Sequence, residues 1–138
     1  MKNKLDECIK IVNEAENDNY KVAGIYYLLQ EFSHDITNRQ INDILKAVSK
    51  LNDDANKCNI TCTIMHNFFL NKNGVDIVVG MFPKMGNEAV HTIMEYAREN
   101  ADAIEDAGKI TSEGIKQLNK SFEGNIFANN DEFIEGRF

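Results

Sequence analysis

Cys62 and His66 are the residues of this chain whose types and spacing are best suited to catalytic chemistry. They lie in segment 59–82, where apolar and polar residues alternate and a β-strand is predicted for the first half. On that strand both side chains would point to the same face, where an imidazole can activate a thiol as a nucleophile. The sequence identifies no group to stabilise an oxyanion. A catalytic Cys62–His66 pair is therefore the alternative, and the main interpretation of His66 is a neutral histidine in the core.

Other combinations of ligand-type residues do not form a recognisable metal or cofactor site. His91 and Glu95 are four residues apart, so on a helix both could face one ion. Zinc sites usually show two spaced ligand pairs, whereas His34 and Asp35 are adjacent. The glycines of segment 80–86 lack the lysine–serine ending of a phosphate-binding loop. We therefore expect no native metal ion and no cofactor.

Five acidic residues form the candidate binding surface on a helix predicted from Asn87 to about Gly108. They follow one another at intervals of seven, four, three and four residues, which places all of them in one stripe: Glu88, Glu95, Glu99, Asp102 and Asp106. Like charges four residues apart destabilise a helix by about 0.2–0.5 kcal/mol, so local stability does not explain the stripe. It predicts a docking surface for a basic protein. The alternative interpretation is a solvated face of an acidic protein.

Segment 59–82 is predicted to form a β-hairpin around which the other elements are arranged. Residues 71–74, Asn-Lys-Asn-Gly, suit a tight turn. If Leu70 pairs with Val75, then His66 meets Val79 and both apolar rows fall on one face. The competing interpretation is helical, because Cys58, Cys62 and Met65 also recur at helical spacing.

Helical periodicity predicts the remaining elements, and Thr37 with Gln40 resembles a capping box before the third helix. The predicted helices cover about 4–17, 20–33, 41–56 and 87–108, with a shorter one from Thr111 or Ser112. The sequence thus predicts an α+β fold, mostly helical, with about five helices and one central hairpin at 59–82 in a single domain, 1–138. An all-α bundle is the alternative. The sequence shows no sustained internal repeat.

Charge and cysteine usage narrow the classes of function. The chain of 138 residues has 22 acidic and 15 basic residues, for a formal net charge of −7. This balance argues against direct binding of nucleic acid, which requires basic residues to displace counterions. Three cysteines without framework spacing are typical of reduced thiols. With a charged N-terminus and no long apolar run, the sequence predicts a cytoplasmic protein without membrane contact.

These features together favour a small non-enzymatic binding protein, and the abundance of asparagine suggests a bacterial or phage source. An inhibitor, immunity protein or anti-defence protein could dock its acidic helix on the basic surface of a nucleic-acid-handling enzyme. One alternative is a small enzyme that uses the Cys/His pair. Another is a self-assembling structural protein, with a homodimer formed through the free edge of the hairpin.

Overall fold

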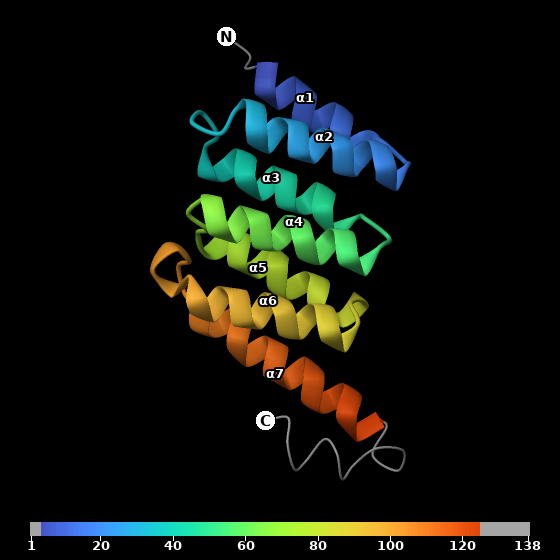
Figure 1. The fold of residues 1–138 in the computed structure, drawn as a ribbon, viewed down its shortest axis with the longest axis vertical. Coiled ribbons are helices and arrows are strands. Elements are labelled where there is room, and N and C mark those ends of the chain that lie inside the picture. Colours follow the sequence, from blue (N-terminus) through green and yellow to red (C-terminus); the bar gives the residue numbers. More distant parts are fainter. Residues whose placement is uncertain (1–3, 125–138) are drawn as a thin grey trace.

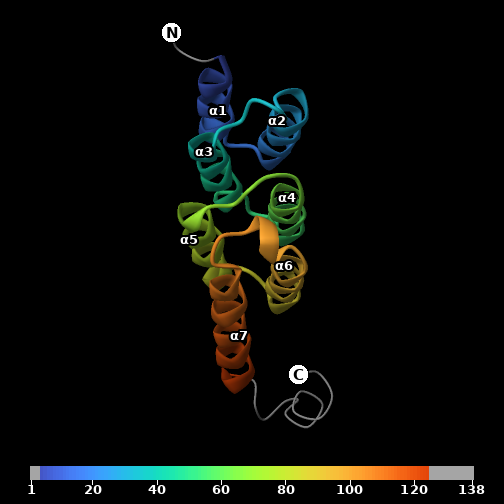
Figure 2. The ribbon, with the colours of Figure 1, turned by 90° about the vertical axis from the view of Figure 1, so that its left-hand side faces the viewer.

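Seven α-helices stacked in two layers make up the described part of the chain. The computed structural model describes residues 4–124. The first layer contains α1 (Lys4–Glu14), α3 (Asn38–Ser49), α5 (Lys72–Met81) and α7 (Ala107–Gly124). The second contains α2 (Asp18–Glu31), α4 (Asp54–Asn67) and α6 (Asn87–Glu99). Figure 1 shows the helices following the long axis in chain order, and Figure 2 shows the two layers side by side. Two short 3₁₀ helices, η1 (Phe82–Lys84) and η2 (Ala101–Ala103), lie in the connections.

The helices recur at nearly constant intervals although the sequence does not visibly repeat. The first-layer helices begin at residues 4, 38, 72 and 107, at intervals of 34, 34 and 35 residues. The main contacts join helices of one pair, neighbours within a layer, and successive pairs. This is the organisation of α-helical repeat arrays, in which each unit buries its apolar face against the next. The absence of a visible sequence repeat therefore concealed a structural one.

Two aspartates at the start of second-layer helices join each helix pair to the next. The carboxylate of Asp18 accepts hydrogen bonds from the backbone N of Asn52 at 2.9 Å and of Asp53 at 3.2 Å. The carboxylate of Asp54 accepts one from the backbone N of Gly86 at 2.8 Å. Asp53 and Gly86 are the N-cap residues of α4 and α6. The same device thus aligns α2 with α4 and α4 with α6.

Two buried lysines also occupy equivalent positions, each four residues after the N-cap of its helix: Lys21 in α2 and Lys57 in α4. Lys21 Nζ donates to the carbonyl oxygens of Val12 at 3.4 Å and Asn13 at 3.0 Å, and also to that of Ala15. These carbonyls lie at the C-terminal end of α1, where helical partners are missing and the dipole favours a cation. Lys21 therefore satisfies the end of the preceding helix.

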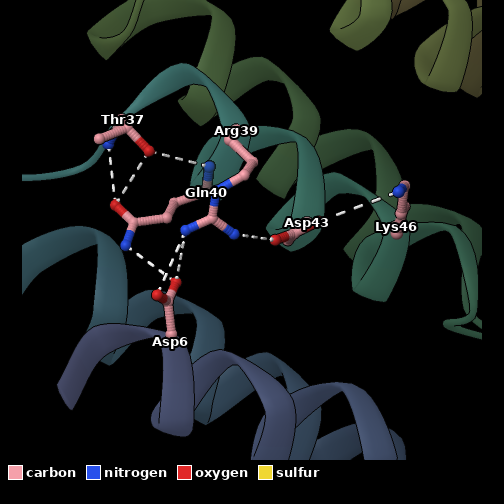
Figure 3. Close-up of polar contacts among 6 residues, drawn as sticks. All are labelled: Asp6, Thr37, Arg39, Gln40, Asp43 and Lys46. Atoms are coloured by element: carbon pink, nitrogen blue, oxygen red, sulfur yellow. Dashed lines mark hydrogen bonds and ion pairs between the residues drawn. The ribbon is translucent and has the colours of Figure 1, made fainter. Parts of the chain in front are cut away.

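A polar network fixes α1 against α3 (Figure 3). Thr37 and Gln40 form the predicted capping box, with Gln40 N donating to Thr37 Oγ1 at 3.2 Å and Thr37 N donating to Gln40 Oε1 at 3.0 Å. Gln40 is buried, and its Nε2 donates to Asp6 of α1 at 3.0 Å. Arg39 donates to the same carboxylate at 3.0 Å and to Asp43 at 3.1 Å. The cap of α3 is thereby coupled to the neighbouring helix.

The predicted β-hairpin at 59–82 is wrong. Residues 59–67 belong to α4, and Lys72–Met81 forms α5. The predicted turn is a helix start, because the Asn71 side chain accepts a hydrogen bond from Gly74 N at 3.0 Å and caps α5. Within residues 4–124, bridge pairing is limited to one isolated contact between Leu70 and Ile104. The described chain is all-helical, which was the alternative to the α+β fold.

The burial of α4 explains the strand-like pattern. This helix contacts α2, α3 and α6, and half of its residues are buried. Its buried positions are both odd and even: Lys57, Cys58, Ile60, Thr61, Cys62, Ile64 and Met65. A helix enclosed on several sides loses the one-sided pattern by which amphipathic helices are recognised. The alternation over 60–64 therefore comes from wide burial and not from a pleated strand.

Two predicted helix ends also need correction. The helix predicted to reach residue 56 ends at Ser49, and α4 begins after the N-cap Asp53. The helix predicted to reach Gly108 ends at Glu99. There the side chain of Asn100 donates to Tyr96 O at 2.9 Å.

The core lies between the two layers and includes residues of the connections, among them Leu51, Leu70 and Ile104. Its fully buried large side chains are Leu5, Ile25, Leu28, Ile41, Ile44, Leu45, Ile60, Ile64, Met65, Leu70, Phe82 and Ile93. No helix within residues 4–124 has both the length and the apolar character needed to cross a membrane.

Candidate functional site

The side of α2, α4 and α6 that faces away from the first layer is named here the outer surface, and on α2 it is aromatic. Tyr20 is 73% exposed, Tyr27 55% and Tyr26 39%. Tyr20 and Tyr27 are seven residues apart, which places them on one face of the helix. Tyr26 lies at the groove between α2 and α4. Exposed tyrosines are typical of protein-binding surfaces.

Beyond its first residue, Asp54, the exposed side of α4 carries no aspartate, glutamate, lysine or arginine. The exposed or half-buried side chains between the helix start and its end are Ala55, Asn56, Asn59, Thr63, His66 and Asn67. Between α2 and α4 lies an open groove of about 640 Å³. It is lined by Tyr26, Leu29, Gln30, Ser33, His34, Thr63, Asn67 and Phe68. Aromatic rings and amide groups therefore meet there, and no carboxylate, lysine or arginine lines the groove.

The α6 part of the outer surface is acidic, but less uniformly than the sequence predicted. Glu88 and Glu99 are exposed, and Glu95 is half-buried. Arg98 Nη1 lies 2.7 Å from Glu95 Oε1, so this arginine neutralises one of the three carboxylates.

The other two residues of the predicted stripe lie beyond the helix. Asp102 is in η2, and Asp106 is in the turn before α7 with a φ of 59°. Leu70 fixes this connection, since its N donates to Ala103 O at 3.1 Å and Glu105 N donates to Leu70 O at 2.8 Å. The five carboxylates therefore continue from α6 into the following connection and do not form one straight stripe.

Cys62 and His66 both lie on α4, one turn apart, but in different surroundings. Cys62 is buried, whereas His66 is exposed. The His66 ring packs edge-on against Tyr96 of α6, with ring centroids 6.1 Å apart. The interpretation of His66 as a core histidine is therefore wrong.

The thiol partner of Cys62 is Cys58, one turn earlier on the same helix. The hydrogen bond from Cys62 lowers the pKa of Cys58 from 9.0 to about 7, against the opposing effect of burial, and Thr92 contributes in the same direction. The same hydrogen bond and burial raise the pKa of Cys62. Cys58 Sγ also lies 3.9 Å from Ala89 O of α6. The pair therefore holds its first negative charge on Cys58.

This proton sharing predicts the pH dependence of thiol reactivity. In a Cys8→Ser background, alkylation of Cys58 by iodoacetamide should rise with pH around a midpoint of about 7, because the thiolate is the nucleophile. In the Cys62→Ala variant the donor is lost while burial remains, so the midpoint should move upward. Mass spectrometry of the modified peptide measures both rates. A midpoint that is the same in both proteins would contradict the assignment.

The histidines considered as metal ligands are dispersed. His91 is exposed on α6 near Glu95, and His34 lies after α2 at the α2–α4 groove. Among the residues that the structure describes, no group of three or more histidine, cysteine or acidic side chains is arranged to hold a metal ion.

Comparison with known proteins adds no identification: no protein family, curated protein or solved structure matches this chain. The tyrosines of α2 are the main feature that the sequence analysis missed. Tyr26 and Tyr27 are adjacent, so both cannot face the core of one helix, and this was the available signal.

Proposed function

We propose that this protein is a non-enzymatic binding module that docks a basic protein partner on the outer surface of α2, α4 and α6. The observation that carries the proposal is the change in side-chain type along this surface. Exposed tyrosines on α2 give way to mainly uncharged polar side chains on α4 and to carboxylates on α6. A two-layer helical stack presents such a surface over several elements at once.

The chemistry at both ends of this surface suits arginine and lysine. A guanidinium stacks on the face of a tyrosine ring through a cation–π interaction and forms charged hydrogen bonds with carboxylates. The amide and hydroxyl groups of Asn59 and Thr63 on the exposed side of α4 offer polar contacts between these ends. The net charge of −7 would also accelerate encounter with a basic partner.

Enzymes that handle nucleic acids are the partner class with the matching surface, because they bind phosphate backbones through clustered basic residues. A protein that covers such residues would act as a competitive inhibitor. An immunity or anti-defence role is the biological form that we infer for this activity, in a bacterial or phage setting.

Charge-matched variants test the proposal on a partner purified after affinity capture from the native host. Glu88 and Glu99 form no ion pair within residues 4–124. The double variant Glu88→Gln/Glu99→Gln should weaken binding by about tenfold or more, with affinity falling as salt rises. The control Glu7→Gln/Glu14→Gln removes two exposed carboxylates from α1 in the first layer and should change affinity by less than about twofold.

Calorimetry or surface plasmon resonance at two salt concentrations separates the outcomes. Equal losses in the two double variants would show that net charge alone matters. An affinity independent of salt and of Glu88 and Glu99 would reject the acidic surface as the docking site. Tyr20→Ser/Tyr27→Ser tests the aromatic end of the same surface.

Self-assembly is the second candidate, and one observation favours it. Ile11 on α1 is 67% exposed, at an end of the stack where helical repeat proteins normally present polar residues. A second copy could cover this end. Light scattering at two protein concentrations, with Ile11→Lys as the disrupting variant, distinguishes a homodimer from a monomer.

A further inference from the structure

The two thiols of α4 play no part in the proposed docking, although the groove beside them shares Asn59 and Glu88 with the docking surface. Cys58 and Cys62 are 8% and 9% exposed. A groove of about 480 Å³ between α4 and α6 reaches Cys58, and its lining includes Asp54, Glu88 and Thr92. Both thiols are thus largely shielded from bulk water, and Cys58 lines the groove.

We propose that Cys58 and Cys62 together bind one Cu(I) ion. Soft thiolate ligands select Cu(I), which accepts two of them in a nearly linear arrangement and so needs no third protein ligand. This differs from zinc, which takes four ligands in structural sites. A pair of cysteines therefore suffices for Cu(I), although no larger ligand group exists within residues 4–124.

Helix geometry favours a bridging ion over a disulfide. Side chains four residues apart on a helix have Cβ atoms about 5–6 Å apart. A disulfide requires about 3.8 Å between these atoms, so its formation would distort α4. An ion inserted between the two sulfurs spans the wider spacing and leaves the helix intact. In α4 the two cysteines stand at this spacing, one turn apart.

The surroundings of the pair also suit a cation. Thiolates are the ligands of Cu(I), so binding of the ion displaces the protons of both thiols. The balance is one Cu(I) ion bound and two protons released from the two thiols. Asp54 and Glu88 at the groove place negative charge along the access route.

Anaerobic competition with the Cu(I) chelator bathocuproine disulfonate tests the site on the full chain. The unmodified protein should withdraw one ion per chain and develop the near-ultraviolet absorption of thiolate-to-copper charge transfer. The variants Cys58→Ala and Cys62→Ala should withdraw none at the same chelator concentration. Cys8→Ala, which removes the third cysteine on α1, is the matched control and should behave like the unmodified protein.

Far-ultraviolet circular dichroism verifies that each variant keeps its helices, and Cys58→Ser replaces Cys58→Ala if the latter unfolds. Bound Cu(I) should also raise the melting temperature of the unmodified protein and leave that of the Cys58 variant unchanged. The proposal is overturned if the unmodified protein leaves the ion on the chelator. It is equally overturned if folded Cys58 and Cys62 variants still withdraw one ion.

Discussion

Replacement of Phe82 by alanine should lower the free energy of unfolding by about 3–5 kcal/mol, the largest loss that we expect from a single substitution. Phe82 begins η1 directly after α5, and its side chain is fully buried. The η1 turn contacts both α5 and α7, so the ring occupies the junction of two helices of the first layer. Its removal deletes apolar contacts and leaves a cavity that the fixed 3₁₀ turn cannot fill.

Urea denaturation followed by circular dichroism measures this loss, with Phe69→Ala as the control. Phe69 follows α4 and is 49% exposed, so the same chemical change should cost less than about 1 kcal/mol. Comparable losses at the two positions would show that Phe82 does not connect α5 with α7 in the way described.

Introduction of a single methyl group at Gly114 should also destabilise the protein, by about 1–3 kcal/mol. Gly114 lies in α7, and an added Cβ would stand 2.3 Å from both Cγ and Sδ of Met94 in α6. This is the closest approach found at any described glycine, and it occurs between the two helices with the most extensive contact. Gly114 therefore allows α6 and α7 to pack tightly.

A double-mutant cycle tests whether the clash with Met94 causes this loss of stability. In a Met94→Ala background the obstacle is gone, so Gly114→Ala should become neutral or stabilising by up to about 1 kcal/mol through helix propensity. The control is Gly108→Ala, near the start of α7, where an added Cβ meets no atom within 4 Å. Thermal unfolding of the four proteins of the cycle, with the control, measures the coupling. A loss that persists in the Met94→Ala background would contradict the steric explanation.

The positions of most helices could be predicted from sequence because their signals are local. The capping box of Thr37 and Gln40 marks the start of α3 correctly, and one-sided apolar spacing identifies α1 and α3. The failure at 59–82 has a physical cause in burial. α4 is enclosed by helices from other parts of the chain, and this environment cannot be read from its own residues. The amide of Asn71 is equally suitable for a turn and for a helix cap, so it could not decide between them.

In the candidate site, too, some features follow from local sequence and others depend on tertiary contacts. The exposure of Glu88 and Glu99 follows from helical spacing and was predictable. The end of α6 at Glu99 was not, because the connection to α7 is held by hydrogen bonds from Leu70, a residue more than thirty positions earlier. The position of the tyrosine side chains depended on which face α2 turns to α4, and this too is set by tertiary contact.

The structural repeat does correspond to a repeat of single residues in the sequence. These residues can be recognised only once their contacts in the fold are known. Asp18 and Asp54 occupy the same place in successive second-layer helices, as do Lys21 and Lys57. Apolar positions vary between units, so a search for identical segments fails. Polar residues that join one unit to the next are more informative, because their geometry tolerates fewer substitutes.

Stacking by neighbour contacts also has a mechanical consequence. When a stack of this kind bends, the rotation is distributed over several helix interfaces. Each interface changes only slightly and none is lost. The hydrogen bonds of Asp18 and Asp54 hold the starts of the second-layer helices together, and His66 packs against Tyr96 near the other ends of α4 and α6. The curvature of the stack can thus change by small rotations at several interfaces while each interface keeps the contacts that join it.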